Sequence, residues 1–369
     1  MRLATILSYI LGLGCAAVAP LKTVAQTTDP IAMLGPSVTP ARDGIFEAFK
    51  TQAAGANPQD ATMAMIRAFD RHDIVMFGEV HGSKQEYEWL CKLMSTPEFA
   101  DRVDDIVVEF GNSLYQQTVD RYVAGEDVPI EEVQKAWRNM VLSVVPVQPV
   151  YAQFYKAVRE ANLKHRGKHQ LRLVMGSPAA DWDKIKDHSD LEPYMNERDQ
   201  WYARMVKEEV LAEHHRALLI MGAGHFLRGQ GLGIVEREIR ASGANPYLIV
   251  FGTNVVDNRG DVDKRFDAWP VPAIVPLSGN WVGELPAQPV ISGGLAPATS
   301  RKLADEADAM LYVAPCNALR LVYVPRTELD GTPYGNEVAR RNMIILGHPE
   351  NFMHQETEPQ CVEPQPASR

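Results

Sequence analysis

Two histidines of this sequence follow short apolar runs in the same frame, Gly-x-x-His. The motif Gly-Glu-Val-His ends at His81 after the apolar run 74–77, and the motif Gly-Ala-Gly-His ends at His225 after the run 218–221. Apolar runs of this length that end at a glycine are typical of buried strands in a parallel sheet. Because open α/β sheets bind ligands at the carboxyl ends of their strands, both histidines are predicted to face one crevice.

Two carboxylates accompany these histidines. Glu79 lies two residues before His81, and Glu109 follows the apolar run 106–108. A carboxylate at the end of a buried strand has lost much of its water, so it needs a metal ion, a cation or a histidine proton as its partner. We therefore predict His81, Glu79, Glu109 and His225 as the catalytic residues.

Two kinds of chemistry are open to these four residues. They suit a divalent metal ion such as Mn, Co or Zn, with His81, His225, Glu79 and Glu109 as ligands and a water in an open position. Without a metal, one histidine would act as a general base on water while a carboxylate orients it.

Three further residues are predicted to bind substrate: Glu86, Arg198 and Trp137. Glu86 also has a structural interpretation, because Ser83 and Glu86 have the spacing of a capping box at a helix start. Arg198 opens a predicted helix, from which it would reach an anionic group.

Glu109 likewise has a structural alternative. Arg138 or Arg228 would neutralise its carboxylate as a buried ion pair if Glu109 took no part in chemistry.

The elements that position these residues alternate between strand and helix. Five apolar runs, two of which end in the histidine motifs, predict a mainly parallel sheet with helices on both faces, an α/β fold. Residues 310–313 and 319–324 are expected to add strands at an edge of this sheet. Residues 112–165 break the alternation, because their apolar side chains recur at helical spacing and predict three helices. This helical insertion would stand over the carboxyl edge of the sheet.

The two ends of the chain differ in composition from the rest. Residues 1–25 have the pattern of a secretory signal with cleavage after Ala25, so we expect a secreted or periplasmic protein. Lipid attachment at Cys15 is the less favoured alternative. Residues 26–42 and 350–369 read as flexible segments around a single domain over 43–349. In an oxidising compartment Cys316 and Cys361 would be able to pair.

Charge and hydropathy exclude two classes of partner. The formal net charge is −10, and no basic patch is visible in the sequence, so nucleic acid is not an expected partner. No run after residue 25 is long and apolar enough to span a membrane. The expected partner is a small-molecule or peptide substrate.

The motifs resemble those of the erythromycin esterase-like, ChaN-like and Tiki/TraB proteins. The matching positions are Gly78 to Gly82 with Glu86 and Tyr87, then Glu109, then Arg198 and Asp199 with Tyr202 and Ala203, and last Gly222 with His225. They occur in the order of that superfamily, across residues 74–251.

This resemblance implies an α/β sandwich with its site at the strand ends. It also implies different activities: lactone hydrolysis with a histidine base, metalloprotease-like hydrolysis, or haem binding at an envelope surface without catalysis. By transfer, His81 would be the base or a metal ligand. Macrolide esterases carry an important arginine in their first helix, where this chain has only Lys84 and Lys92. A macrolide substrate is therefore not expected.

Overall fold

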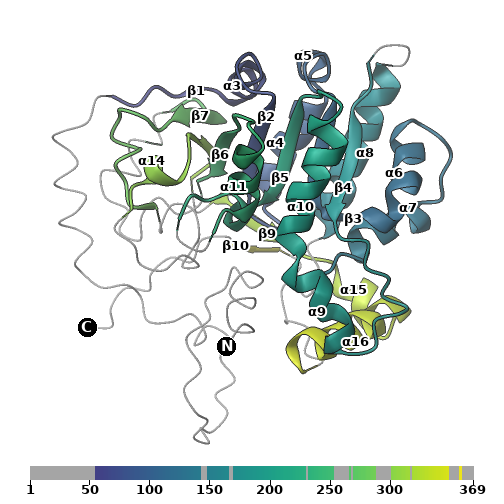
Figure 1. Ribbon diagram of the computed structural model, residues 1–369. Helices are drawn as coiled ribbons and strands as arrows, with labels where there is room; N and C mark the ends of the chain where they lie inside the picture. Colours follow the sequence, from purple (N-terminus) through teal and green to yellow (C-terminus); the bar gives the residue numbers. More distant parts are fainter. Residues whose placement is uncertain are drawn as a thin grey trace, which may run out of the picture.

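The computed structural model describes residues 55–142, 148–165, 169–229, 232–252, 266, 269–287, 301–315, 318–348 and 357–359. The predicted signal segment, residues 26–42, Cys15, Cys316 and Cys361 lie outside the described residues. An eight-stranded sheet in the order β1-β7-β8-β6-β2-β5-β3-β4 forms the centre of the molecule, with helices packed around it (Figure 1). The predicted α/β fold is confirmed.

Six strands of the sheet run parallel. They are β2 (Ile74–Glu79), β3 (Asp105–Asn112), β4 (Arg172–Ser177), β5 (Ala217–Gly222), β6 (Tyr247–Phe251) and β8 (Ala309–Tyr312). Strand β7 (Ala273–Pro276) is antiparallel to β8 and to the short β1 (Gln59–Asp60). All six residues of β2 are buried, as expected for a parallel strand covered on both faces.

Alternate residues of β2 enter two different hydrophobic cores. Val75 and Phe77 pack into the core beneath α4 (Lys84–Met94) and α8 (Gln148–Lys164). Ile74 and Met76 pack into the core beneath α10 (Arg198–Val206) and α11 (Ile234–Ala241). The sheet therefore has helices on both faces, as the apolar runs predicted.

The predicted edge strands were wrong in their placement. Residues 309–312 form β8, which lies between β6 and β7, and the edges of the sheet are β1 and β4. Strand β9 (Arg320–Val322) pairs instead with β10 (Thr357–Pro359) in a separate two-stranded sheet. The Val322 N–H also donates to the Gly82 carbonyl at 2.9 Å, so β9 supports the turn after His81. Apolar runs identify strands but do not specify their neighbours.

The helical insertion contains the three predicted helices. They are α6 (Gln116–Val123), α7 (Ile130–Arg138) and α8, and one 3-10 turn, η2 (Ser113–Tyr115), precedes them. The insertion packs beside β3 and β4, and α8 also packs along α4 (Figure 1). The remaining helices are α3 (Ala61–Ala68), α5 (Pro97–Ala100), α9 (His188–Asn196), α14 (Leu303–Glu306), α15 (Arg326–Leu329) and α16 (Pro333–Leu346).

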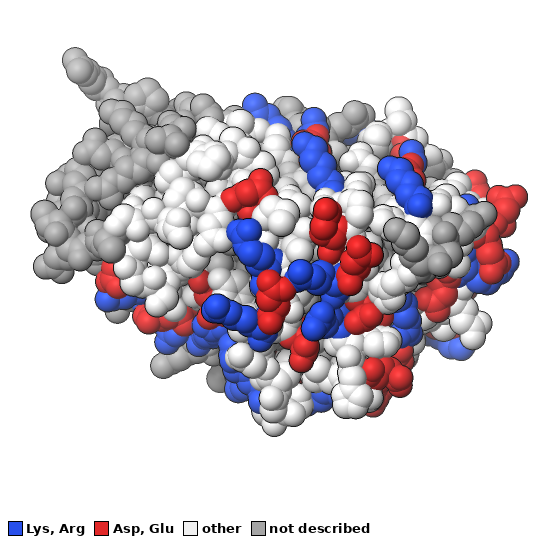
Figure 2. Space-filling view, turned by 90° about the horizontal axis from the view of Figure 1, so that it is seen from above, with Lys and Arg blue, Asp and Glu red and all other residues white. Residues whose placement is uncertain are grey.

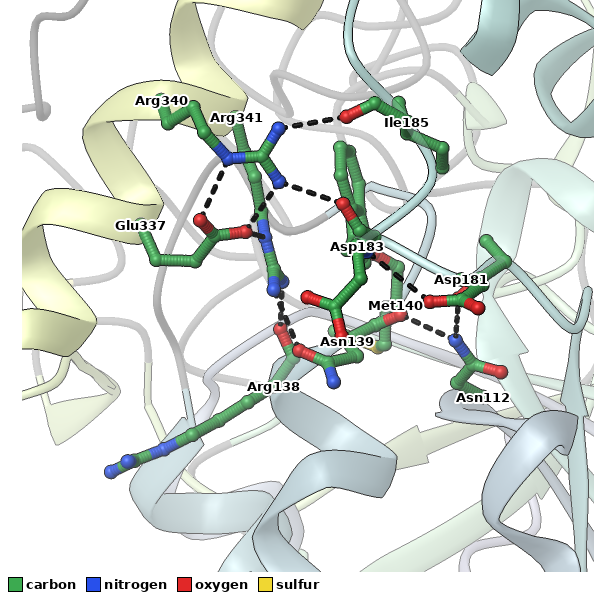
Figure 3. A network of polar contacts seen from close by, with 12 residues as sticks. Asn112, Arg138, Asn139, Met140, Asp181, Asp183, Ile185, Glu337, Arg340 and Arg341 are labelled. Atoms are coloured by element: carbon green, nitrogen blue, oxygen red, sulfur yellow. Dashed lines mark hydrogen bonds and ion pairs between the residues drawn. The ribbon is translucent and has the colours of Figure 1, made fainter.

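Helix α16 is tied to the segments that follow β3 and β4. Arg341 donates to the Arg138 carbonyl at 2.6 Å and to Asn139 Oδ1 at 2.7 Å, while Arg340 donates to the Ile185 carbonyl at 2.8 Å (Figure 3). Asn112, at the end of β3, donates to the Asn139 carbonyl at 2.7 Å. These bonds fix the C-terminal helix at the carboxyl edge of the sheet.

Helices α3 and α5 precede β2 and β3 and lie at the top of Figure 1, so these strands run downward from there. Figure 2 looks onto this upper face, where basic and acidic side chains are interspersed. Among the described residues, no helix is long and apolar enough to cross a membrane.

Candidate functional site

Three adjacent strands carry the predicted site residues to one end of the sheet. Strand β5 lies between β2 and β3, and Glu79 is in register with Gly222 of β5. Glu79 belongs to β2, Glu109 belongs to β3, and His225 lies in the 3-10 turn η4 (Ala223–His225) that follows β5. The structure therefore brings His81, His225, Glu79 and Glu109 together.

His81 and Glu79 form a close pair. His81 Nδ1 contacts Glu79 Oε1, and the Tyr87 hydroxyl donates to the other carboxylate oxygen at 3.1 Å. The Glu79 side chain is fully buried, whereas that of His81 is 41% exposed. Burial alone would lower the pKa of His81, but the charges of Glu79 and Glu109 outweigh it and raise the pKa to about 9. One edge of the His81 ring is thus fixed by a carboxylate while the ring remains accessible.

His225 is held differently, between two carboxylates. Its Nδ1 lies 2.9 Å from Asp199 Oδ1 and its Nε2 lies 3.3 Å from Glu109 Oε1. Its side chain is only 4% exposed. Burial would lower the pKa of His225, but the charges of Glu109 and Asp199 outweigh it and raise the pKa to about 9. With this pKa His225 is largely an imidazolium at neutral pH, so neither nitrogen has a lone pair to offer: Nε2 faces Glu109 Oε1 and Nδ1 forms an ion pair with Asp199.

Glu109 is neutralised mainly by two histidines, with a smaller contribution from the charge of Arg198. Its Oε2 accepts the Gly222 N–H at 2.7 Å, and its Oε1 faces His225. Burial would raise the pKa of Glu109, but the positive charges of His225 and His81 outweigh it and lower the pKa. The suggested structural partners are engaged elsewhere, since Arg138 pairs with Glu328 and Arg228 pairs with Asp308. The arginine alternative for Glu109 was therefore wrong.

Asp199 was missed as a site residue. An acidic residue in the first turn of a helix is common, so its type and place gave no reason to select it. Its position beside Arg198, in a segment that resembles a superfamily motif, was the signal that would have identified it. The charge of His225 outweighs burial and lowers the pKa of Asp199.

The three predicted substrate-binding residues lie in different surroundings. Arg198 is 8% exposed, and its Nε lies 3.7 Å from Asp199 Oδ1, so it lies beside the residues of the site. Trp137 is 2% exposed and packs against Tyr155 in the core, at a ring-centroid distance of 4.9 Å. The structure does not bring Trp137 to the site.

Glu86 is fully buried, and its carboxylate accepts the Val80 N–H at 3.1 Å. Ser83 is the N-cap of α4 but makes no side-chain cap hydrogen bond, so the predicted capping box was wrong. By binding the Val80 N–H, the Glu86 carboxyl group instead fixes the backbone between Glu79 and His81. Burial and the nearby charge of Glu79 raise the pKa of Glu86 well above its ordinary value.

Aromatic side chains form one wall of the site. Tyr151 of α8 stacks on Phe110 at 4.2 Å with an interplanar angle of 4°, and Tyr87 meets both rings edge-on. The Tyr151 hydroxyl lies 3.5 Å from His81 Nδ1. The helical spacing within residues 112–165 does not identify Tyr151 as a site residue, because spacing does not show what a side-chain hydroxyl group contacts.

Three residues have donor atoms that fit a metal ion. One ligand atom each from Glu79, His81 and Glu109 lies within 4.8 Å of the others. Two carboxylates and an imidazole suit Mn, Co or Zn. His225 fits the predicted ligand set less well, because both of its nitrogens face carboxylates.

Gly222 lies directly beneath the His81 ring. A Cβ atom at this position would lie 3.2 Å from His81 Cε1 and 3.3 Å from Glu109 Oε2. We expect Gly222→Ala to displace both side chains and lower kcat/KM by about tenfold or more, because misplaced catalytic groups lose rate steeply. Gly55→Ala is a control for glycine removal at an open position, since nothing lies within 4 Å of an added Cβ atom there. Unchanged kcat/KM in Gly222→Ala would show that the close packing of His81 and Glu109 against Gly222 does not matter for activity.

Searches of protein-family models and of curated proteins give no match to this chain. Among solved structures, a Bacillus cereus protein is 13% identical over 73% of this chain and 97% of its own, with a TM-score of 0.47. A succinoglycan biosynthesis protein is 10% identical over 75% of this chain and 98% of its own, with a TM-score of 0.49.

A ChaN protein of Campylobacter jejuni, described with cofacial haem binding, is 11% identical over 51% of this chain and 85% of its own, with a TM-score of 0.36. ChaN is among the groups that the sequence motifs resemble. At these identities and TM-scores, the likenesses carry no conclusion about activity.

Proposed function

We propose that this chain is an exported hydrolase that activates water at His81 to cleave an ester or peptide bond. The observation that carries the proposal is the pairing of a buried carboxylate, Glu79, with one nitrogen of a half-exposed imidazole. This is the arrangement of a general base with its orienting partner. Export rests on the signal pattern of residues 1–25.

In the proposed reaction the Glu79 carboxylate accepts a hydrogen bond from the Nδ1–H of His81 and another from the Tyr87 hydroxyl. His81 Nε2 accepts a proton from a water molecule while the water oxygen bonds to the substrate carbonyl carbon. The bond from the carbonyl carbon to the leaving oxygen or nitrogen then breaks, and the same proton passes from Nε2 to that leaving atom. His225, which lies between Glu109 and Asp199, keeps Glu109 ionised and oriented beside this centre.

A divalent metal ion is compatible with this proposal. Glu79, His81 and Glu109 are the residues that would hold it, and it would lower the pKa of a bound water. Metal analysis of the purified, untagged protein separates the two versions: stoichiometric Mn, Co or Zn favours a metallohydrolase, and its absence favours the histidine base alone.

The raised pKa of His81 predicts how the rate depends on pH. A general base must be neutral, and with a pKa of about 9 most of His81 is protonated at pH 7. We expect kcat/KM to rise roughly tenfold per pH unit from pH 7 and to level off near pH 9. The measurement is a pH profile in chelator-containing buffer, on a substrate selected from an ester and peptide library. A profile that is flat from pH 7 to 9 would contradict His81 as the base.

A haem- or iron-binding envelope protein without catalysis is the second candidate. Its support is the exposed His81 imidazole, together with the sequence resemblance to ChaN-like proteins. Titration with haemin would then shift the Soret band of wild-type protein but not that of His81→Gln. No shift at micromolar haemin would remove this candidate.

A further inference from the structure

We propose that Tyr151 is a positioning residue that holds the His81 imidazole in a single orientation. The helical insertion would then be part of the active site and not only extra core. The catalytic consequence rests on the proposed hydrolase function, whereas the orientation of the ring does not.

The Tyr151 side chain is buried, with 2% of the residue exposed. A buried phenol hydroxyl needs a hydrogen-bonding partner. Among the described residues, this hydroxyl contacts His81 Nδ1 at 3.5 Å, so its oxygen lies as a second acceptor beside the Nδ1–H that Glu79 binds. Tyr155, one turn later on the same helix, is satisfied by other groups, the Phe110 carbonyl and Met175 Sδ, both at 3.0 Å.

The ring of Tyr151 has little freedom to move its hydroxyl elsewhere. It is stacked on Phe110, the residue after Glu109 on β3, and its centroid lies 5.6 Å from that of Tyr87. Tyr87 in turn donates to Glu79. The aromatic contacts therefore direct two hydroxyl groups, from α4 and α8, toward the Glu79–His81 pair.

Orientation matters because the two edges of the His81 ring are different. The Nδ1 edge faces Glu79 and Tyr151, and the Cε1–Nε2 side lies over Gly222. A flip of the ring by 180° would present a carbon to both oxygen atoms and would move Nε2 away from its place. Glu79 and Tyr151 together therefore favour the orientation in which Nε2 is available for substrate.

A nuclear magnetic resonance experiment tests the orientation without any substrate. Protein labelled with ¹⁵N at histidine is compared as wild type, Tyr151→Phe and the control Tyr155→Phe, with His81 signals assigned from His81→Gln. We expect Tyr151→Phe to shift and broaden the His81 Nδ1 signal, while Tyr155→Phe leaves it in place. An unchanged His81 signal in Tyr151→Phe would overturn the inference.

Kinetics then test the consequence for catalysis. Loss of one hydrogen bond predicts that kcat falls about tenfold in Tyr151→Phe with little change in KM, since the ring and its stacking remain. Tyr155→Phe should keep wild-type kcat. If His81→Gln is inactive and Tyr151→Phe retains full kcat, the catalytic part of the inference fails and the hydrolase proposal stands. If His81→Gln is also fully active, the hydrolase proposal itself fails.

Discussion

Replacing His81 by glutamine is expected to lower kcat/KM by about 10²- to 10⁴-fold, the contribution of a general base. The side chain is 41% exposed, and a glutamine amide is still able to donate to Glu79. Because the imidazolium beside the buried Glu79 carboxylate is lost while an amide donor is kept, the free energy of unfolding should fall by about 1–3 kcal/mol. The measurement is steady-state hydrolysis of a substrate that the wild type cleaves, with denaturant unfolding of both proteins in parallel.

His169→Gln is the matched control for this experiment. His169 is 45% exposed and contacts the Val103 carbonyl, just before the start of β3 and away from the carboxyl edge. This variant should keep wild-type activity and stability. Wild-type turnover in His81→Gln would contradict the assignment of His81 as the base.

Replacing His225 by alanine is expected mainly to lower the free energy of unfolding. The substitution leaves Glu109 and Asp199 buried without the imidazolium between them, and breaking a buried ion pair in this way costs about 3–5 kcal/mol. Chemical denaturation at pH 6 measures the loss. His169→Ala, which removes an exposed contact to Asp104, should cost at most about 1 kcal/mol.

The pH dependence and a double variant identify the cause of this loss. Because the folded-state pKa of His225 is raised to about 9, its stabilisation is fully present below its ordinary pKa and is lost as the pH rises through 9. The difference in the free energy of unfolding between wild type and His225→Ala should therefore become smaller as the pH is raised from 6.5 to 9. Adding Asp199→Asn to His225→Ala should recover part of the stability, since one stranded charge is removed. If His225→Ala were as stable as wild type, His225 would not be the imidazolium that neutralises Glu109 and Asp199.

His81 and His225 have different predicted roles, although their sequence motifs are alike. Both end a Gly-x-x-His motif after a buried strand, and both were predicted as bases or metal ligands. The difference arises from Asp199, which reaches His225 from α10 and occupies its second nitrogen. His81 has a carboxylate on one nitrogen only.

Five strands of the sheet, their parallel arrangement and the end of the sheet at which the site lies were predictable from residue order alone. Period and apolarity are local properties, so the runs ending at Glu79, Glu109 and Gly222 identified the strands that carry the site. The three helices of the insertion followed from spacing in the same way.

The strand order and the partners of each polar group became known from the folded structure. Strand β5 lies between β2 and β3 although it follows both in the chain, and this order places His225 against Glu109. Tyr151 reaches His81 from a helix 70 residues later, and Trp137 of the same insertion is buried in the core. Such contacts depend on how whole elements pack, and the local pattern of one sequence contains no information about that packing.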